Sequence, residues 1–165
     1  MFKNLFKKSQ TQSEVLIAPL NGKIVPLEEV PDPVFSQKMM GEGAAIIPSE
    51  GKVVAPISGK IVQVPESKHA IGLESDNGTE ILIHVGLETV ALKGEGFEVK
   101  VSTGDTVTVG QSLIEFDLEY IRKEAKDIVT PIIITNSKPE EKDYHVTSDV
   151  TAIAGETELI TITNK

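Results

Sequence analysis

The sequence contains no cysteine and no tryptophan, and only 4% of its 165 residues are aromatic. Without cysteine the chain has no disulfide framework, no thiolate metal site and no cysteine nucleophile. No apolar stretch approaches the roughly 20 residues that a membrane-spanning helix requires, and no apolar signal-peptide segment follows the N-terminus. These absences favour a cytoplasmic protein.

Positive charge is also scarce, because 16 lysines and arginines stand against 25 aspartates and glutamates, which gives a formal net charge of −9. Lys3, Lys7 and Lys8 supply all the charge of the first eight residues, so the remainder of the chain carries −12. Nucleic-acid binding normally needs a basic face that contacts phosphates, and this balance argues against it. An acidic body is compatible with a basic protein partner.

The length allows one domain with a proper core. We expect a single domain over residues 14–165, preceded by a flexible tail and linker over residues 1–13. Residues 1–8, MFKNLFKK, place apolar side chains at helical spacing among lysines. A basic amphipathic segment of this kind can touch an anionic membrane surface, but two turns are marginal as an isolated helix. A disordered tail and a weak peripheral contact with the inner face of the membrane therefore both remain open.

An internal repeat organises the rest of the chain. Residues 18–25, APLNGKIV, recur 37 positions later as APISGKIV at residues 55–62, with six of the eight positions identical. Each copy has the composition of a strand, a turn and a second strand. The pattern predicts an all-β fold, an antiparallel β-sandwich or flattened barrel with two pseudo-repeated halves and short surface helices.

Local signals predict two helices and one further hairpin. Asp32 and a following proline suit the start of a short helix that would end by residue 41. Residues 118–126 suit a surface helix with Asp117 as its N-cap. Residues 99–101 and 106–109 are predicted to pair around a turn at 102–105.

The first predicted helix carries three apolar side chains that are expected to share one side, those of Phe35, Met39 and Met40. They could fill the core. They could also form an adaptable docking surface, for which methionine is well suited.

The most informative stretch is residues 79–90, TEILIHVGLETV, an apolar strand that contains one imidazole. In a two-residue period His84 shares its face with Leu82 and Gly86. A glycine at the next position on the same face would leave the ring approachable. A single histidine in an apolar strand is more often structural, so this position alone does not establish a function.

The dipeptide Asn77-Gly78, just before this strand, is a strong hairpin signal. If these are the two loop residues, His84 lies opposite Ile71. The same register sets His69 opposite Gly86, so the imidazoles share one face as diagonal neighbours with Cβ atoms roughly 7–8 Å apart. A three-residue loop would be expected to send the two histidines to opposite faces.

Two chemistries suit such a pair. His69 and His84 could supply two of the four ligands of a zinc site, and a partner carboxylate would be needed to complete it. Alternatively, one neutral imidazole offers a lone pair to an electrophile, while the other donates a hydrogen bond to a transferring phosphoryl group. The second chemistry requires no cofactor. The third histidine, His145, is expected to be exposed and without a role.

Several segments carry a family resemblance: IAPLNGKIV, VPDPVF, KVVAPISGKIV, KHAIGLESDNGTEILIHVGLETV, LKGEGF and LIEFD. They resemble the glucose-type enzyme IIA of the bacterial phosphotransferase system over residues 15–135. The motif HA-x6-NG-x5-H-x-G is specific to that resemblance. It implies that His84 is phosphorylated on Nε2 and that His69 helps to pass the phosphoryl group onward. Ser67 stands where the family usually has a threonine that hydrogen-bonds within the site.

The resemblance also implies a docking surface around the histidines. Glu88 stands where the family usually has aspartate, and Ile71, Leu82 and Val85 stand where it has aromatic residues. The replacements at Ile71, Leu82 and Val85 bear on the choice of partner rather than on the chemistry. The expected docking residues are Phe35, Met39, Met40, Ile71, Leu82, Gly86, Glu88 and Val90.

Three functional hypotheses follow. The first is a phosphocarrier that takes a phosphoryl group from the general histidine phosphocarrier protein and passes it to the cysteine of a sugar-specific IIB domain. The second is a regulatory module that binds other proteins according to its phosphorylation state, with zinc held between the histidines and a partner. The third is a biotinyl- or lipoyl-type carrier, because Gly104 to Val107 resembles that class. Its carrier lysine would be Lys38, in the only Lys-Met pair, yet this lysine falls in a predicted helical turn.

Overall fold

A computed structural model describes residues 13–165 of the chain. Of the predicted tail and linker over residues 1–13, residues 1–12 lie outside the described residues, and Ser13 begins the first strand. The strands are β1 (Ser13–Ile17), β2 (Gly22–Pro26), β3 (Glu42–Pro48), β4 (Lys52–Val54), β5 (Gly59–Gln63), β6 (Ala70–Ser75), β7 (Glu80–His84), β8 (Phe97–Val99), β9 (Thr106–Val107), β10 (Ser112–Phe116), β11 (Thr130–Ile134), β12 (Lys142–Val146), β13 (Thr151–Ala152) and β14 (Glu158–Asn164). The helical segments are η2 (Leu27–Glu29), α1 (Pro33–Ser36), η3 (Thr89–Leu92) and α2 (Leu118–Glu124).

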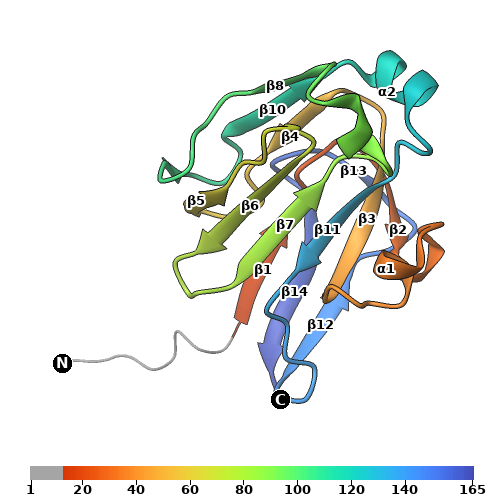
Figure 1. Ribbon diagram of the computed structural model, residues 1–165. Helices are drawn as coiled ribbons and strands as arrows, with labels where there is room; N and C mark the ends of the chain where they lie inside the picture. Colours follow the sequence, from red (N-terminus) through yellow and green to blue (C-terminus); the bar gives the residue numbers. More distant parts are fainter. Residues whose placement is uncertain (1–12) are drawn as a thin grey trace.

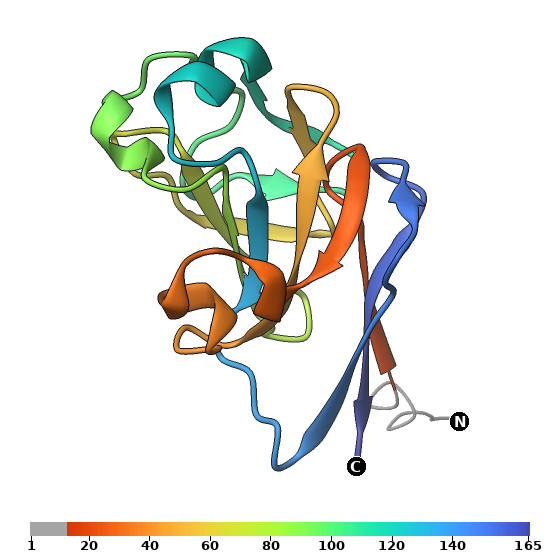
Figure 2. The same cartoon turned by 90° about the vertical axis from the view of Figure 1, so that its right-hand side faces the viewer.

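The strands form three antiparallel sheets (Figure 1). The large sheet has the order β13-β2-β3-β11-β7-β6-β5-β9, and the small sheets have the orders β1-β14-β12 and β4-β10-β8. Figure 2 shows the β1-β14-β12 sheet as a separate layer on one side of the large sheet, with the α1 segment on the other side. Apolar side chains from all three sheets fill the core between them, among them Leu16, Ile46, Ile71, Ile83, Leu113 and Ile160. The predicted antiparallel sandwich is confirmed.

The predicted pseudo-repeat extends through the whole topology. Taken with the apolar residues that precede it, the first copy contributes β1 to one small sheet and β2 to the large sheet, and the second copy, extended in the same way, contributes β4 and β5. In the large sheet β2 and β5 stand second from opposite ends, each beside a two-residue edge strand. The two strands of each copy therefore belong to different sheets.

The two copies also bond to each other across the pseudo-two-fold axis. Ile17 N–H donates to the Pro56 carbonyl at 2.8 Å. Val54 N–H donates to the Pro19 carbonyl, also at 2.8 Å. Ile17 and Val54, like Pro19 and Pro56, are 37 positions apart, so the second bond repeats the first with the roles of the copies exchanged.

The helices agree with their predicted starts better than with their predicted ends. Asp32 caps α1 by accepting from Val34 N–H at 3.0 Å, and Asp117 caps α2 by accepting from Tyr120 N–H at 3.1 Å. However, α1 ends at Ser36 and Lys38 adopts a φ of 58°. Residues 39 and 40 therefore lie beyond the helix and do not extend its apolar side.

The predicted hairpin over residues 99–109 is wrong. Strand β8 pairs with β10, whereas β9 pairs with β5 in the large sheet. The turn at 102–105 therefore joins two sheets instead of closing a hairpin within one.

None of the helices in residues 13–165 combines the length and apolar composition needed to cross a membrane.

Candidate functional site

The register of the β6–β7 hairpin differs from the prediction by one residue. His84 lies opposite Ala70, and Ile71 lies opposite Ile83. Ser75 N–H donates to the Thr79 carbonyl at 2.8 Å, so the loop holds three residues, 76–78.

The two histidines nevertheless meet. Their ring centroids are 4.7 Å apart, with the planes inclined at 81°. His69 lies one residue before β6 and follows Lys68, whose φ of 61° is left-handed. Its side chain is therefore outside the regular alternation of the strand. The predicted pairing of the imidazoles is correct, but the predicted dependence on loop parity is wrong.

The proton on the His84 ring is placed by one backbone group. Its Nδ1 lies 2.8 Å from the Gly86 carbonyl oxygen. A carbonyl can only accept, so Nδ1 is the donor and carries the proton. Burial lowers the pKa of His84, opposed by the Gly86 hydrogen bond and the Asp32 carboxylate. The neutral ring therefore presents its lone pair on Nε2.

His69 is more strongly held in the neutral form. It is 7% exposed, and burial together with the neighbouring His84 lowers its pKa from 6.5 to about 4. Its Nδ1 lies 2.7 Å from the Ser67 hydroxyl oxygen. Because Nδ1 is engaged in this way, Nε2 of His69 is the ring nitrogen left for a ligand.

A second apolar cluster lies beside the pair. This outer cluster consists of buried Val25, Leu27, Val30, Phe35, Ala45, Leu87, Val129 and Ile133, with Met40 and Leu82 packed against it. The ring of Phe35 lies 5.3 Å from the His84 ring, between centroids, at an inclination of 55°. Phe35 is 5% exposed, so it belongs to the core and also borders the site.

The glycine at position 86 has a different role from the one predicted. Its φ of 74° is left-handed, and an added Cβ would lie 2.8 Å from Thr89 Cγ2 and 3.0 Å from the Asp127 carbonyl oxygen. A side chain there would collide with the loop interior and not with His69. The residue matters to the site through its carbonyl, which orients the His84 ring.

The predicted docking residues differ widely in exposure: Phe35, Ile71 and Gly86 are buried, and Met40 and Leu82 are half-buried. Met39 and Val90 are 68% and 58% exposed, and Glu88 is also exposed. Ile71 is fully buried in the main core because its side chain faces Ile83. Ile71 therefore cannot contact a partner, and its place on the predicted surface is wrong.

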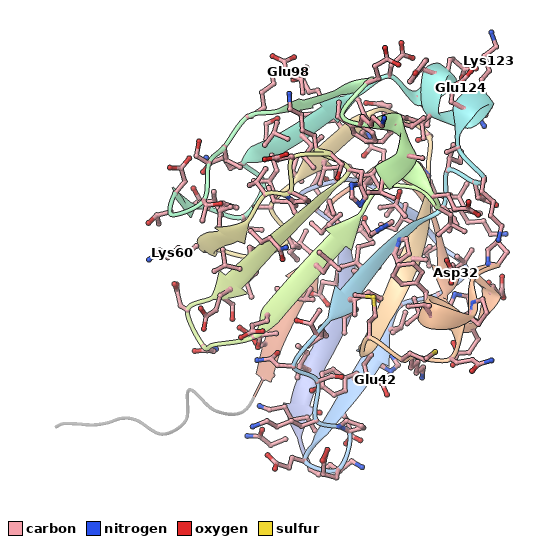
Figure 3. The ribbon with its side chains drawn as sticks, viewed as in Figure 1. Asp32, Glu42, Lys60, Glu98, Lys123 and Glu124 are labelled. Atoms are coloured by element: carbon pink, nitrogen blue, oxygen red, sulfur yellow. The ribbon has the colours of Figure 1, made fainter. Side chains whose placement is uncertain are left out.

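Two contributions to the site were not recognised in the sequence. Asp32 was predicted only as a helix cap, yet its carboxylate also acts on the pKa of His84. Lys126 was predicted at the end of a surface helix, yet its Nζ donates to the Pro31 carbonyl at 3.1 Å and so holds the segment before α1. Figure 3 shows Asp32 beside α1, at the right of the view, and Lys60, on β5, at the far left. The sequence signal for Asp32 is its place between two prolines, which fixes the local backbone.

Metal-ligating side chains do not gather at the histidines within the part of the chain that the structure describes. Within residues 13–165 no three histidine or carboxylate side chains are arranged to hold a metal ion. An open groove of about 670 Å³ lies elsewhere, between β4, β8 and the start of α2, and neither histidine lines it. His145, on β12, is exposed. At the paired histidines, His69 is buried and His84 is partly exposed.

Several known proteins are similar to this chain in sequence or in fold. The family described as "phosphoenolpyruvate-dependent sugar phosphotransferase system, EIIA 1" matches residues 14–139. The "PTS system glucose-specific EIIA component" of Bacillus anthracis is 55% identical over 166 residues, covering 100% of both chains. Its namesake from Staphylococcus aureus (strain COL) is 52% identical over 165 residues, covering 99% of both. The solved structure of the glucose permease IIA from Mycoplasma capricolum has a TM-score of 0.83 at 36% identity, covering 91% of this chain and 96% of that one. The chain therefore belongs to the EIIA 1 family of the phosphoenolpyruvate-dependent sugar phosphotransferase system.

Proposed function

We propose that the chain carries a phosphoryl group on Nε2 of His84. The donor is the phosphohistidine of the general histidine phosphocarrier protein, and the acceptor is the cysteine of a sugar-specific IIB domain. Glucose is the expected sugar because the Bacillus and Staphylococcus relatives are described as glucose-specific. The observation that carries the proposal is the hydrogen bond from His84 Nδ1 to the Gly86 carbonyl, which directs the lone pair to Nε2.

The transfer balances without a cofactor. His84 Nε2 forms a bond to phosphorus while the bond to the donor nitrogen breaks, and the ring proton stays on Nδ1, hydrogen-bonded to the Gly86 carbonyl. In the second step the thiolate of the IIB domain forms a bond to phosphorus and the N–P bond breaks, which returns the neutral ring. Because little covalent chemistry is asked of the protein, positioning and electrostatic stabilisation account for catalysis.

His69 and Ser67 are assigned to the stabilisation of the transferring group. If the Ser67 hydroxyl donates to Nδ1 of His69, then Nε2 of His69 carries the proton. That N–H can donate to a phosphoryl oxygen. The contact of 2.7 Å between Ser67 Oγ and His69 Nδ1 supports this arrangement.

The test is labelling by phosphoenolpyruvate and the two general components. His84→Ala should take up no label. His69→Ala should be labelled but should fail to pass the group to a IIB domain. Label on His84→Ala would contradict the assignment, and normal onward transfer by His69→Ala would remove the helper role. Circular dichroism of both variants controls for folding.

A second proposal is regulatory binding through the same surface. The exposed apolar side chains of Val34, Met39 and Val90 favour it, because they offer contact area to more than one partner. Both Nδ1 atoms are already engaged, so the two Nε2 atoms are the ones that would hold zinc, with a partner carboxylate. Phosphorylation of His84 would block that site. Equal sets of captured partners for the phosphorylated and unphosphorylated protein would contradict this proposal.

A further inference from the structure

Buried polar side chains are few and are concentrated near the histidines. Within residues 13–165 the buried polar or charged residues are His69, Ser75, Thr89 and Thr130. Both threonines are fully buried, and both hydrogen-bond to the backbone that follows His84. Burial of a hydroxyl group costs free energy unless the hydroxyl is hydrogen-bonded. The hydrogen-bond partners of these two hydroxyls therefore identify the backbone groups that they hold in place.

Thr89 bonds to the carbonyl of Val85, a residue whose N–H bonds to the backbone of His69. Its hydroxyl donates to the Val85 carbonyl at 2.6 Å. Val85 N–H in turn donates to the His69 carbonyl at 2.7 Å. Val85 directly follows His84, so one residue is tied on one side to Thr89 and on the other side to the backbone of His69. The methyl group of Thr89 also occupies the space beside Gly86.

Thr130, on β11, bonds to the residue that orients the His84 ring. Its hydroxyl oxygen accepts from Gly86 N–H at 3.4 Å and its proton is donated to the Ile128 carbonyl at 3.0 Å. The carbonyl of Gly86 is the group that accepts from His84 Nδ1. Thr130 therefore fixes one end of Gly86 while His84 bonds to the other.

We propose that Thr89 and Thr130 are positioning residues, which act through Val85 and Gly86 to hold His84 in one tautomer at a fixed distance from His69. The proposal rests on the proposed role of His84 as the phosphoryl carrier. Thr130 controls mainly the tautomer, because it bonds to Gly86. Thr89 controls mainly the separation of the two rings, because it bonds to Val85. Small misplacements of reacting groups lower transfer rates by up to about 100-fold.

The first experiment measures the tautomer directly. In the native protein, ¹⁵N shifts of the His84 ring at pH 7.5 should show a protonated Nδ1 and an unprotonated Nε2. Thr130→Val removes the acceptor with little change of shape and should produce a mixture of the two tautomers. Thr130→Ser keeps the hydroxyl and should restore the native pattern. Thr135→Val, an exposed change on the segment after β11, is the matched control and should leave the shifts unchanged.

The second experiment measures transfer. Thr89→Val should lower the rate of onward transfer to a IIB domain about 10-fold or more, with a smaller effect on uptake of the phosphoryl group. Thr89→Ser should restore most of the onward rate. If Thr89→Val does not fold, Thr89→Ala removes the same hydroxyl without adding bulk, and the comparison with Thr89→Ser is unchanged.

The outcomes separate this proposal from the proposed function. Folded valine variants with native ring shifts and native transfer rates would overturn the positioning role. Serine variants that behave like the valine variants would also overturn it, because they retain the hydroxyl. If the native protein takes up no phosphoryl group on His84, the carrier role fails, while the ring shifts still decide whether the threonines fix the tautomer.

Discussion

The two pseudo-symmetric halves carry different residues at equivalent places. Gly22 lies opposite Pro48 in β3, as Gly59 lies opposite Ser75 in β6. Five residues before these partners, Gly43 lies opposite Ile133 and Ala70 lies opposite His84. Ile133 of one half and His84, the candidate phosphoryl carrier, of the other therefore occupy equivalent positions on the same face of the large sheet. By the same count, Glu42 of the first half corresponds to His69.

The connections around these two places also differ. In the first half the chain between β2 and β3 spans residues 27–41 and includes η2 and α1. In the second half the chain between β5 and β6 spans only residues 64–69. The longer connection covers Ile133, which is fully buried in the outer cluster, whereas His84 stays partly exposed. The difference shows that one sheet position becomes a core residue or a surface site according to the length of its neighbouring connection.

The most severe test of this comparison replaces His84 by isoleucine, the residue at the equivalent position of the first half. His84→Ile should fold normally and should take up no phosphoryl group, because isoleucine offers no lone pair. Labelling by phosphoenolpyruvate and the general components measures the loss. Uptake by this variant at even a few per cent of the native level would show that another residue carries the group.

The reverse exchange should act on stability. Ile133→His puts an imidazole into the outer cluster, which consists of apolar side chains, and should lower the free energy of unfolding by about 2–4 kcal/mol. Urea denaturation of this variant and of His84→Ile gives the comparison. Equal stability of the two variants would mean that the two places have similar surroundings, which contradicts their difference in burial.

The histidines should make stability depend on pH. Because folding lowers the pKa of His69 from 6.5 to about 4, the unfolded chain binds more protons between these values. The His69 contribution is therefore present above pH 6.5 and is lost as the pH falls toward 4, by about 2–3 kcal/mol. The lowered pKa of His84 adds in the same direction. Urea midpoints at pH 7.5 and 4.5 should differ less in His69→Gln than in the native protein.

The smallest expected effect is that of Asp32 on the pKa of His84. Asp32 belongs to the β2–β3 connection of the first half, yet its carboxylate acts on the histidine of the second half. Asp32→Asn and Asp32→Ala both remove a negative charge, so both should lower the pKa of His84, as measured by NMR titration. Only alanine also removes the cap of α1, which should cost about 1 kcal/mol. If asparagine leaves the pKa of His84 unchanged, the carboxylate has no electrostatic influence on the ring.

Much of the fold and site follows from local sequence signals. The repeat predicted a two-fold sandwich, and the caps Asp32 and Asp117 were found by residue type. These features depend on neighbours in the sequence, which is why they could be predicted. The histidines do meet, but the two-residue turn from which their pairing was predicted is absent, and His69 instead follows the left-handed Lys68.

The register of the hairpin could not be predicted, because a distant residue contributes to it. The carboxylate of Glu14, on β1, accepts hydrogen bonds from the hydroxyls of Ser75 and Thr79 at the base of the loop. Thr79 N–H also bonds to the Ser75 hydroxyl. These contacts fit a loop of three residues and override the preference of Asn-Gly for a loop of two. The position of Ile71 follows from this register. The predicted register set Ile71 opposite His84, whereas in the observed register it lies opposite Ile83 and is buried.

The reciprocal bonds between the two repeat copies have a consequence for how a lone site can arise. A surface that bonds to its own rotated copy is isologous, as in a two-fold homodimer. In such a dimer every substitution appears twice, so histidine at one place requires histidine at the other. Here both copies lie in one covalent chain, and each can change independently. A single chain with internal two-fold contacts thus keeps the stability of a symmetric assembly while only one of its halves carries the paired imidazoles.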